Sequence, residues 1–151
     1  TQVVHITGEL DWPEVEAQTR GLNEMQQSRY HIYPYLHEEM GAVLAAADLV
    51  LSRGGASALG EYPLFGLPAI LVPYPHAWRY QKVNAAYLTR QGAAVTLEDS
   101  QLKETLLPTV RAVLQTPERL DSMRASMRRL AHPQAAVEIA EELIALAEKR
   151  R

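Results

Sequence analysis

Three small residues precede an acidic position within residues 53–61, whose sequence is RGGASALGE. The first amide N–H groups of a helix have no acceptor inside the helix, and the helix end carries partial positive charge. Gly54, Gly55 and Ala56 have little or no side chain, so an anion can approach those amides closely, and Ser57 adds a hydroxyl donor. These residues are therefore typical of a phosphate-binding turn.

Glu61 follows Ser57 by four residues, on the same face of the predicted helix and about one turn further in. A carboxylate accepts hydrogen bonds and donates none, so it suits the paired hydroxyls of a ribose rather than a phosphate. Diphosphate on the amides and a ribose on the acid together describe a nucleotide. The alternative is an ordinary strand–helix turn with Glu61 on a solvated face, because the spacing is neither a P-loop nor G-x-G-x-x-G.

The glycine turn is expected to lie between a strand and a helix. The apolar run at residues 49–51 is short and bounded by polar residues, which predicts a buried strand. A helix is expected at residues 56–65, ended by Gly66-Leu67-Pro68, and another strand at residues 69–72. Open α/β sheets bind ligands at the carboxyl ends of such strands, so the turn has the expected position for a binding site.

A second polar loop follows at residues 73–84. Gln81 has both an amide donor and an acceptor, which is the equipment needed to bind sugar hydroxyls; alternatively, it bonds nearby backbone at the start of a helix. Asn84 is expected to order the loop rather than to contact a ligand. Trp78 and Tyr80 either form a stacking surface for a sugar or are exposed loop aromatics, and for Trp78 we favour the latter.

The rest of the chain alternates between strand and helix patterns, without internal repeats. Further strands are expected at residues 3–6, 31–35 and 93–97, and further helices at residues 13–27, 38–47, 81–91, 102–115, 117–130 and 135–149. The last helix has one apolar stripe, formed by Ile139, Leu143, Ile144 and Ala147. This alternation predicts an α/β fold with a Rossmann-like parallel sheet and helices on both faces.

Length and composition restrict the class of protein. The 151 residues, 47% of them hydrophobic, suffice for one domain with a real core. The sequence contains no long uncharged apolar run, so it predicts no membrane span. The chain has no cysteine, so it forms no disulfide. Its net charge of −3 does not indicate binding of nucleic acid. It begins at Thr1, without an initiator Met, and almost at once enters a strand, which suggests a piece of a longer protein or a processed one.

Three motifs, RGGASALGE, GLPAILVPYPH and QKVNA, resemble in sequence and spacing the donor-binding half of family 28 glycosyltransferases. The resemblance covers nearly the whole chain. It implies that residues 1–151 are the C-terminal, nucleotide-sugar-binding domain of a two-domain GT-B enzyme. The N-terminal acceptor domain and the first strand and loop of the C-terminal domain would then be missing from this chain.

The resemblance also implies an activity. It is strongest to the members that transfer N-acetylglucosamine from UDP-N-acetylglucosamine to undecaprenyl-diphosphate-muramyl-pentapeptide in peptidoglycan synthesis. The implied partners are UDP-N-acetylglucosamine and, through the missing domain, the lipid-linked acceptor, with no metal or cofactor bound by this domain. The full-length protein would be cytoplasmic and peripheral on the inner face of the membrane. No general base is paired with a nucleophile in this chain, so we expect no catalytic residue here and an inactive isolated chain.

Eight residues match the donor-binding positions of the family: Arg53, Gly55, Ala56, Ser57, Ala58, Glu61, Gln81 and His37. The resemblance implies that Glu61 contacts the ribose, that Gln81 contacts the N-acetylglucosamine, and that the backbone of His37 meets the uracil. Arg53 either balances the charge of the diphosphate or braces the turn by bonding to carbonyl groups.

Some positions depart from the family pattern. Ala58 stands where the family commonly has Thr, which removes a hydroxyl near the phosphate, and Tyr80 stands where His or Gln often precedes the sugar-binding Gln. The family usually has Phe-Ile-Asp-Asp before the residue that matches Met40, so Leu36 and His37 stand at the Phe and Ile positions, and a main-chain contact would tolerate that change. His37, Glu38 and Glu39 are expected to form a solvated first helical turn rather than a metal site, and His5 a packed, hydrogen-bonded strand residue.

Two other functions are compatible with a donor-binding domain that works together with a second domain or subunit. One is a free-standing donor subunit of a two-chain N-acetylglucosamine transferase. The other is part of a UDP-N-acetylglucosamine 2-epimerase, which would need carboxylates at the sugar that the sequence does not place.

Overall fold

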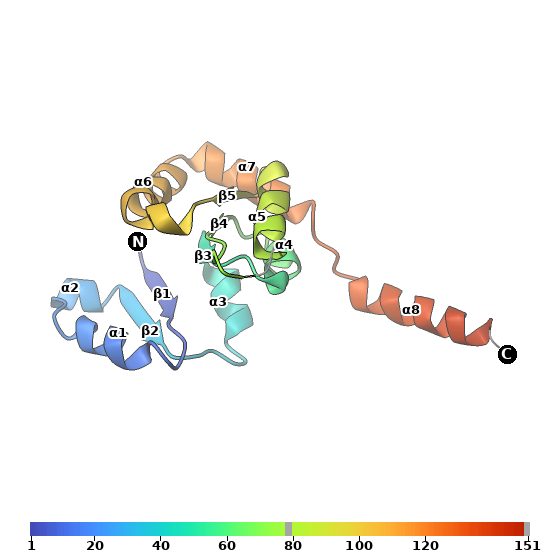
Figure 1. Ribbon diagram of the computed structural model, residues 1–151, viewed down its shortest axis with the longest axis horizontal. Helices are drawn as coiled ribbons and strands as arrows, with labels where there is room; N and C mark the ends of the chain where they lie inside the picture. The colour runs from blue at the N-terminus through green and yellow to red at the C-terminus, as the bar shows by residue number, and fades with distance from the viewer. Residues whose placement is uncertain (78–79, 150–151) are drawn as a thin grey trace. The chain divides into compact units, whose positions relative to one another are not determined.

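The computed structural model describes residues 1–77 and 80–149, which form an α/β protein with parallel strands (Figure 1). The chain divides into two compact units, Thr1–Ala46 and Ala47–Arg151, and each unit contains its own parallel sheet. The predicted α/β class with parallel strands is confirmed.

The first unit holds a two-stranded sheet and three helices. Its elements are β1 (Val3–Ile6), α1 (Trp12–Thr19), α2 (Glu24–Gln27), β2 (Tyr30–Tyr33) and α3 (Met40–Ala46). The strands pair in parallel, with Val3 opposite Tyr30 and Ile6 opposite Tyr33. Nδ1 of His5, on β1, lies 2.6 Å from the hydroxyl of Tyr30. The expectation of a hydrogen-bonded strand histidine is therefore confirmed.

Two helix predictions in this unit are wrong in their bounds. The single helix expected at residues 13–27 is broken into α1 and α2, because Asn23 starts a new helix. Its side chain accepts the N–H of Gln26 at 2.9 Å, and Gln26 Oε1 accepts the N–H of Asn23 at 3.0 Å. The next helix begins at Met40, so Glu38 and Glu39 precede it instead of forming its first turn.

The second unit holds a three-stranded sheet in which β4 is central. Its elements are β3 (Val50–Ser52), the 3-10 helix η1 (Ala56–Leu59), α4 (Glu61–Phe65), β4 (Ala69–Leu71), α5 (Tyr80–Arg90), β5 (Ala94–Thr96), the 3-10 helix η2 (Asp99–Gln101), α6 (Leu102–Leu114), α7 (Pro117–Arg128) and α8 (Ala135–Glu148). All three strands are parallel, in the order β3-β4-β5. Their carboxyl ends therefore lie at one edge, and the loops that follow them meet there.

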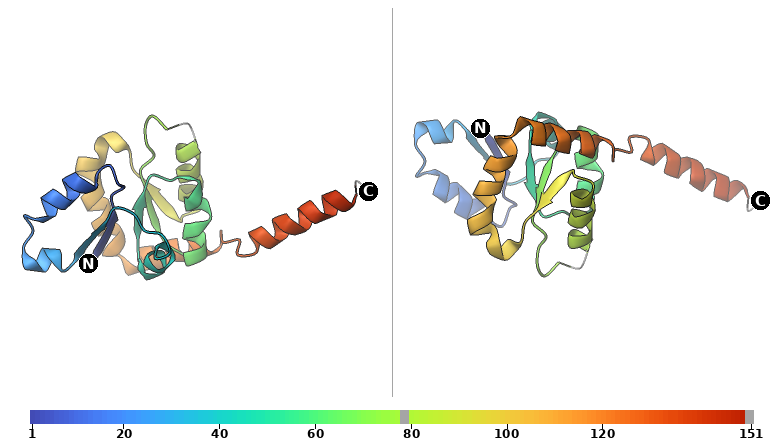
Figure 2. Two further views of the ribbon diagram at one scale, coloured as in Figure 1. Left: turned by 90° about the horizontal axis from the view of Figure 1, so that it is seen from below. Right: turned by 90° about the horizontal axis from the view of Figure 1, so that it is seen from above.

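The core of the second unit forms around β4. Ala69, Ile70 and Leu71 are completely buried, as expected of a central parallel strand that is covered on both faces. α5 packs against β5, and α7 packs against α4 and α6 (Figure 2). The helices contribute further fully buried side chains, among them Leu88 and Met127. This core holds the strand ends, and with them the loops, in fixed relative positions.

The helix predicted at residues 56–65 is also wrong as a single element. It is a short 3-10 helix followed by a short α-helix, with the break at Gly60. Pro63 explains the break, because it has no N–H to donate to the carbonyl of Leu59 and its ring would collide with that carbonyl in a continuous helix. The predicted end of the helix is confirmed: Gly66 has the left-handed conformation, φ 58° and ψ 37°.

The three helices predicted after the last strand are confirmed as α6, α7 and α8, with bounds that differ by at most two residues. The apolar stripe expected on α8 is exposed, since Ile139, Leu143 and Ile144 each keep about 60% of their surface accessible. Within the described part of the chain, every helix is too short or too polar to traverse a bilayer.

Candidate functional site

The candidate site consists of the segments that follow the strands of the second unit. Arg53 comes directly after β3, the loop from Val72 to α5 follows β4, and Asp99 lies three residues after β5. Side-chain hydrogen bonds connect these segments. The predicted donor-binding residues of this unit all lie at or just beyond this edge of the sheet.

Gly54 makes the sharp turn out of β3. Its φ of +77° is in the left-handed region, which strongly favours glycine. A Cβ at this position would lie 3.5 Å from the backbone oxygen of Gln81 and 3.8 Å from Cβ of Ala85. Asn84 Nδ2 donates to the carbonyl of Gly54 at 3.2 Å. Asn84 was expected to order its own loop, at residues 73–84, but its recorded bond stabilises the glycine turn after β3 instead.

The turn leaves three consecutive amides without partners. The N–H groups of Gly55, Ala56 and Ser57 form no hydrogen bond within residues 1–77 and 80–149. The next amide, that of Ala58, donates to the carbonyl of Gly55 at 3.1 Å. A Cβ added to Gly55 would meet nothing within 4 Å. An anion therefore has an open approach to the three amides.

Ala58 differs from its neighbours in this loop. Its side chain is 1% exposed, and its N–H is already bonded within the loop. Ala58 therefore packs beneath the turn, and a direct part in donor binding stays a prediction.

Glu61 is the first residue of α4, because the helix breaks immediately before it. Its side chain is exposed, and no hydrogen bond or ion pair to it is formed by the described residues. The carboxylate can therefore accept hydrogen bonds from a ligand.

Tyr62, the next residue, has a phenol whose pKa is raised, mainly by burial. The negative charge of Glu61 raises this pKa further, whereas a hydrogen bond with Ser52 lowers it. The raised pKa keeps the Tyr62 phenol neutral.

Arg53, which follows β3, bonds to the segments that follow the other two strands. Its Nη1 donates to the carboxylate of Asp99 and, at 3.4 Å, to the carbonyl of Val72. Its guanidinium carbon lies 5.5 Å from the centre of the Tyr74 ring, in reach of a cation–π interaction. The side chain keeps half of its surface exposed. Arg53 therefore bonds to a carbonyl, as one of the two expectations held. Its Nε and Nη2 form no hydrogen bond with residues 1–77 or 80–149, so they can donate to an anion.

Asp99 and Tyr74 were not among the site residues expected from the sequence. Asp99 is 46 residues from Arg53 in the chain. The signal that was present is topological: an acid shortly after one predicted parallel strand and an arginine directly after another are expected at the same edge of the sheet.

Gln81 combines features of both expectations for it. Its Oε1 accepts the backbone N–H of Tyr74 at 2.8 Å, so the side chain stabilises the loop after β4. Its amide nitrogen forms no hydrogen bond with the described residues and remains available to a sugar hydroxyl. Tyr80 is 71% exposed at the start of α5. Trp78 lies outside the described residues.

His37 belongs to the first unit. Its ring lies 4.7 Å from that of Tyr35, and its side chain is exposed. Its carbonyl accepts the N–H of Met40 at 3.3 Å, whereas its own N–H forms no hydrogen bond among the residues that the structure describes. A main-chain contact with a base stays a prediction for this residue.

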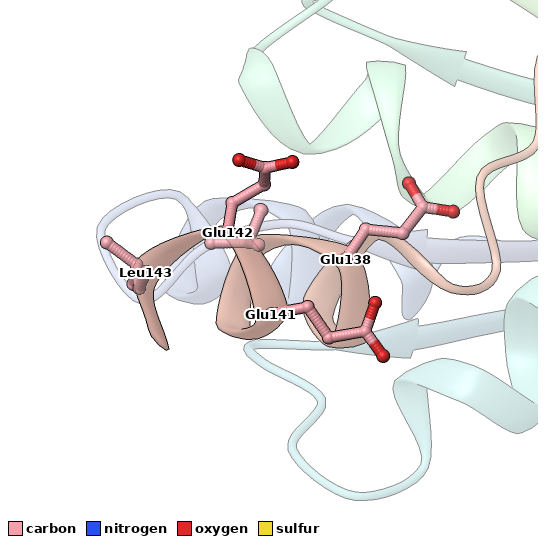
Figure 3. A pocket seen from close by; sticks show the side chains of 5 residues that line it. Glu138, Glu141, Glu142 and Leu143 are labelled. Carbon is pink, nitrogen blue, oxygen red and sulfur yellow. The ribbon is translucent and has the colours of Figure 1, made fainter. Parts of the chain in front are cut away.

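Two surface hollows are lined by other residues. One follows α8 and is lined by Glu138, Ile139, Glu141, Glu142 and Leu143, whose carboxylates repel an anion (Figure 3). The other lies beside α5 and β5 and is lined by Pro73, Lys82, Ala86, Thr89, Arg90, Thr96 and Glu98. Neither contains a predicted donor-binding residue. No group of three or more His, Asp or Glu side chains suited to a metal occurs in residues 1–77 and 80–149.

The sequence matches known proteins over most of its length. The family described as glycosyltransferase family 28 C-terminal domain matches residues 1–142. Curated relatives named UDP-N-acetylglucosamine–N-acetylmuramyl-(pentapeptide) pyrophosphoryl-undecaprenol N-acetylglucosamine transferase include proteins of Roseiflexus sp. (39% identity over 92% of this chain), Chlorobium limicola (41% over 93%) and Gloeobacter violaceus (43% over 89%). The chain spans only 36–38% of the length of these relatives.

Solved structures agree with this match. The crystal structure of Acinetobacter baumannii MurG superimposes with a TM-score of 0.76 and 25% identity, over 93% of this chain and 40% of that one. The glycosyltransferase VinC, solved in complex with dTDP, gives a TM-score of 0.69 over 90% of this chain and 32% of its own; at 20% identity, this likeness concerns the fold alone.

The two adjacent glycines are expected to differ in their effect on stability. Gly54→Ala places a side chain at φ +77° and should lower the free energy of unfolding by about 1–2 kcal/mol. Gly55→Ala should change it by less than about 0.5 kcal/mol, because φ there is −60° and the space is open. Urea denaturation of both variants measures the difference. Equal losses would mean that the turn is not built as described.

Proposed function

The chain belongs to the family of glycosyltransferase family 28 C-terminal domains, and from that membership we propose that it binds UDP-N-acetylglucosamine as the donor-binding domain of an N-acetylglucosamine transferase. In this proposal the remainder of a longer protein binds the acceptor, an undecaprenyl-diphosphate-linked muramyl pentapeptide. The names of these relatives support the choice of donor sugar and acceptor over the epimerase and the two-chain transferase.

One observation carries the proposal: the amides of Gly55, Ala56 and Ser57 and the carboxylate of Glu61, four to six residues later, form no hydrogen bond with the described part of the chain. The amides are donors that suit a diphosphate, and the carboxylate is an acceptor that suits a ribose diol. Phosphate oxygens accept hydrogen bonds, whereas ribose hydroxyls can also donate them, so donors and an acceptor close together in the chain support that ligand class.

The proposed chemistry at this site is stabilisation of the leaving group. When the sugar transfers to the acceptor hydroxyl, the bond between its anomeric carbon and the diphosphate breaks, and negative charge develops on the UDP oxygen. Amides fixed by the protein backbone and the free donors of Arg53 stabilise that charge without reorganisation. The amide nitrogen of Gln81 would donate to a hydroxyl of the sugar.

The acceptor determines where the reaction would take place. Undecaprenol is a lipid, whereas the nucleotide sugar is a soluble anion, so the two substrates meet at a membrane surface. We therefore propose a peripheral protein on the cytoplasmic face of the membrane. The base that activates the acceptor would lie outside this domain, so the isolated chain should not transfer sugar, and detectable transfer by residues 1–151 alone would contradict this part of the proposal.

Titration of the full-length protein with four nucleotide sugars tests the proposal as a whole. We expect UDP-N-acetylglucosamine to bind more tightly than UDP-glucose, and the corresponding GDP sugars to bind at least about tenfold more weakly, by calorimetry. Preferential binding of a GDP sugar would overturn the choice of donor. Epimerised product in place of transfer to a lipid acceptor would overturn the choice of reaction.

Glu61→Ala is expected to weaken UDP binding by the full-length protein by about 1.5–3 kcal/mol, the range for loss of a charged hydrogen-bond partner. Folding should be nearly unaffected, since the side chain is exposed. Calorimetry with UDP and 2′-deoxy-UDP isolates the contact with the ribose. The wild type should bind 2′-deoxy-UDP more weakly than UDP, whereas Glu61→Ala should bind the two compounds with equal affinity.

Glu104→Ala is the matched control for that substitution, because Glu104 is also an exposed acid in the first turn of a helix, α6. It should leave both affinities unchanged. If Glu61→Ala also left the affinity for UDP unchanged, the ribose role would be wrong.

Gly55→Val is expected to weaken UDP binding by about 1–3 kcal/mol while leaving the affinity for uridine unchanged, because the side chain obstructs only the approach of the phosphates. The open space around Gly55 and its negative φ allow the variant to fold. Unchanged affinity for UDP would argue against close approach of the diphosphate to these amides.

A further inference from the structure

The ion pair between Arg53 and Asp99 joins the turn after β3 to the segment after β5. It is partly sheltered, with 50% of the Arg53 side chain and 29% of the Asp99 side chain exposed. Both residues lie beyond the carboxyl ends of their strands, on the same edge as the unpartnered amides of the glycine turn. The pair is therefore part of the candidate site rather than of the general surface.

Asp99 restricts the conformation of Arg53. An arginine side chain loses considerable rotamer entropy when it is fixed, so an unanchored Arg53 would have to be ordered by the ligand itself. In this structure Nη1 is already held by the Asp99 carboxylate and the Val72 carbonyl, and the guanidinium lies over the Tyr74 ring. The entropic cost is therefore met before a ligand binds, which raises the affinity of the site.

The contact leaves Arg53 able to bind an anion. A guanidinium has five N–H donors in a planar fork, and both recorded hydrogen bonds come from Nη1. The other donors, on Nη2 and Nε, belong to a side chain that is half exposed. A carboxylate on one side of the fork and a phosphate on the other can thus bind the same arginine together, without competing for one donor.

The same contacts extend to the sugar side of the site. Tyr74, over which the guanidinium lies, donates its backbone N–H to Oε1 of Gln81 at 2.8 Å. The backbone oxygen of Gln81 in turn lies against Gly54, at 3.5 Å from the position of a Cβ. Arg53, Tyr74, Gln81 and Gly54 are thus connected by successive contacts, and Asp99 is bound to this group through Arg53.

We propose that Asp99 is a positioning residue for the donor diphosphate, which acts by holding Arg53 with its free N–H groups directed to the ligand. This inference rests on the proposed function, since it concerns the same ligand. It predicts that Asp99 affects binding of phosphates and not of the nucleoside, and that its effect requires Arg53.

A double-mutant cycle in the full-length protein tests the inference. Calorimetry gives the Kd of UDP and of uridine for the wild type, Asp99→Ala, Asp99→Asn, Arg53→Ala and the double variant Arg53→Ala/Asp99→Ala. We expect Asp99→Ala to weaken UDP binding about five- to tenfold and uridine binding less than twofold. In the Arg53→Ala background, loss of Asp99 should change the affinity for UDP less than twofold. Asp99→Asn preserves the shape of the side chain and should also weaken UDP binding.

Two further variants complete the test. Asp99→Glu restores the charge and should recover part of the affinity for UDP. Glu98→Ala removes the neighbouring exposed acid, for which no ion pair with Arg53 is recorded, and should change no affinity by more than twofold. A purely structural role for Asp99 would instead lower the affinities for UDP and uridine together.

Three results would overturn the inference: unchanged or tighter UDP binding by Asp99→Ala, an equal loss of uridine binding, or a further loss from Asp99→Ala in the Arg53→Ala background. Tighter binding would mean that Asp99 competes with the diphosphate for Arg53. If the wild type binds UDP and the Asp99 variants bind it equally well, only the role of Asp99 fails. If the wild type does not bind UDP, the proposed function fails as well.

Discussion

A backbone amide that has no acceptor inside the protein must find one in solvent or in a ligand. At the end of β3 the chain turns through Gly54 at φ +77°, and the next three amides find no acceptor among the residues that the structure describes. Two contacts stabilise the turn in this shape: Asn84 donates to the carbonyl of Gly54, and the backbone oxygen of Gln81 lies 3.5 Å from the position that a Cβ of Gly54 would occupy. The remaining features of the site depend on this constraint.

The loops beyond the three strands act as one structure. Arg53 is joined to Asp99 after β5 and to Val72 after β4, and Gln81 is joined to Tyr74 within the loop after β4. A parallel sheet makes such contacts possible, since it brings the carboxyl ends of strands that are distant in sequence to one edge. The helix dipole contributes less than the sequence suggested, because η1 has four residues and α4 has five. Fixed individual amides and the arginine are therefore the main positive features of this edge.

Local sequence signals predicted much of this fold. Apolar runs predicted the strands to within a few residues, and Gly66 before Leu67-Pro68 predicted the end of α4. The breaks within predicted helices were missed because their causes act over single residues: Pro63 withholds one N–H from the helix, and Asn23 supplies one cap. Hydrophobic periodicity, averaged over many residues, does not detect such causes.

The site itself was predictable in its backbone but not in its side-chain partners. The run of small residues identified the turn, and the amide and the acid were identified by their hydrogen-bonding capacity. The partner of Arg53 depends on which loops meet and in which rotamers, and a separation of 46 residues carries no local signal of that kind. His37 illustrates the same limit, since a main-chain contact leaves no trace in the identity of the side chain.

The most direct test of the account observes the amides themselves. In a ¹⁵N-labelled full-length protein, saturation with UDP should shift the backbone N–H resonances of Gly55, Ala56 and Ser57 strongly, as expected for amides that donate to a diphosphate. Saturation with uridine should leave these three resonances nearly unchanged. If UDP binds while the three resonances do not move, or if uridine moves them equally, the diphosphate is not bound at this turn and the central claim is wrong.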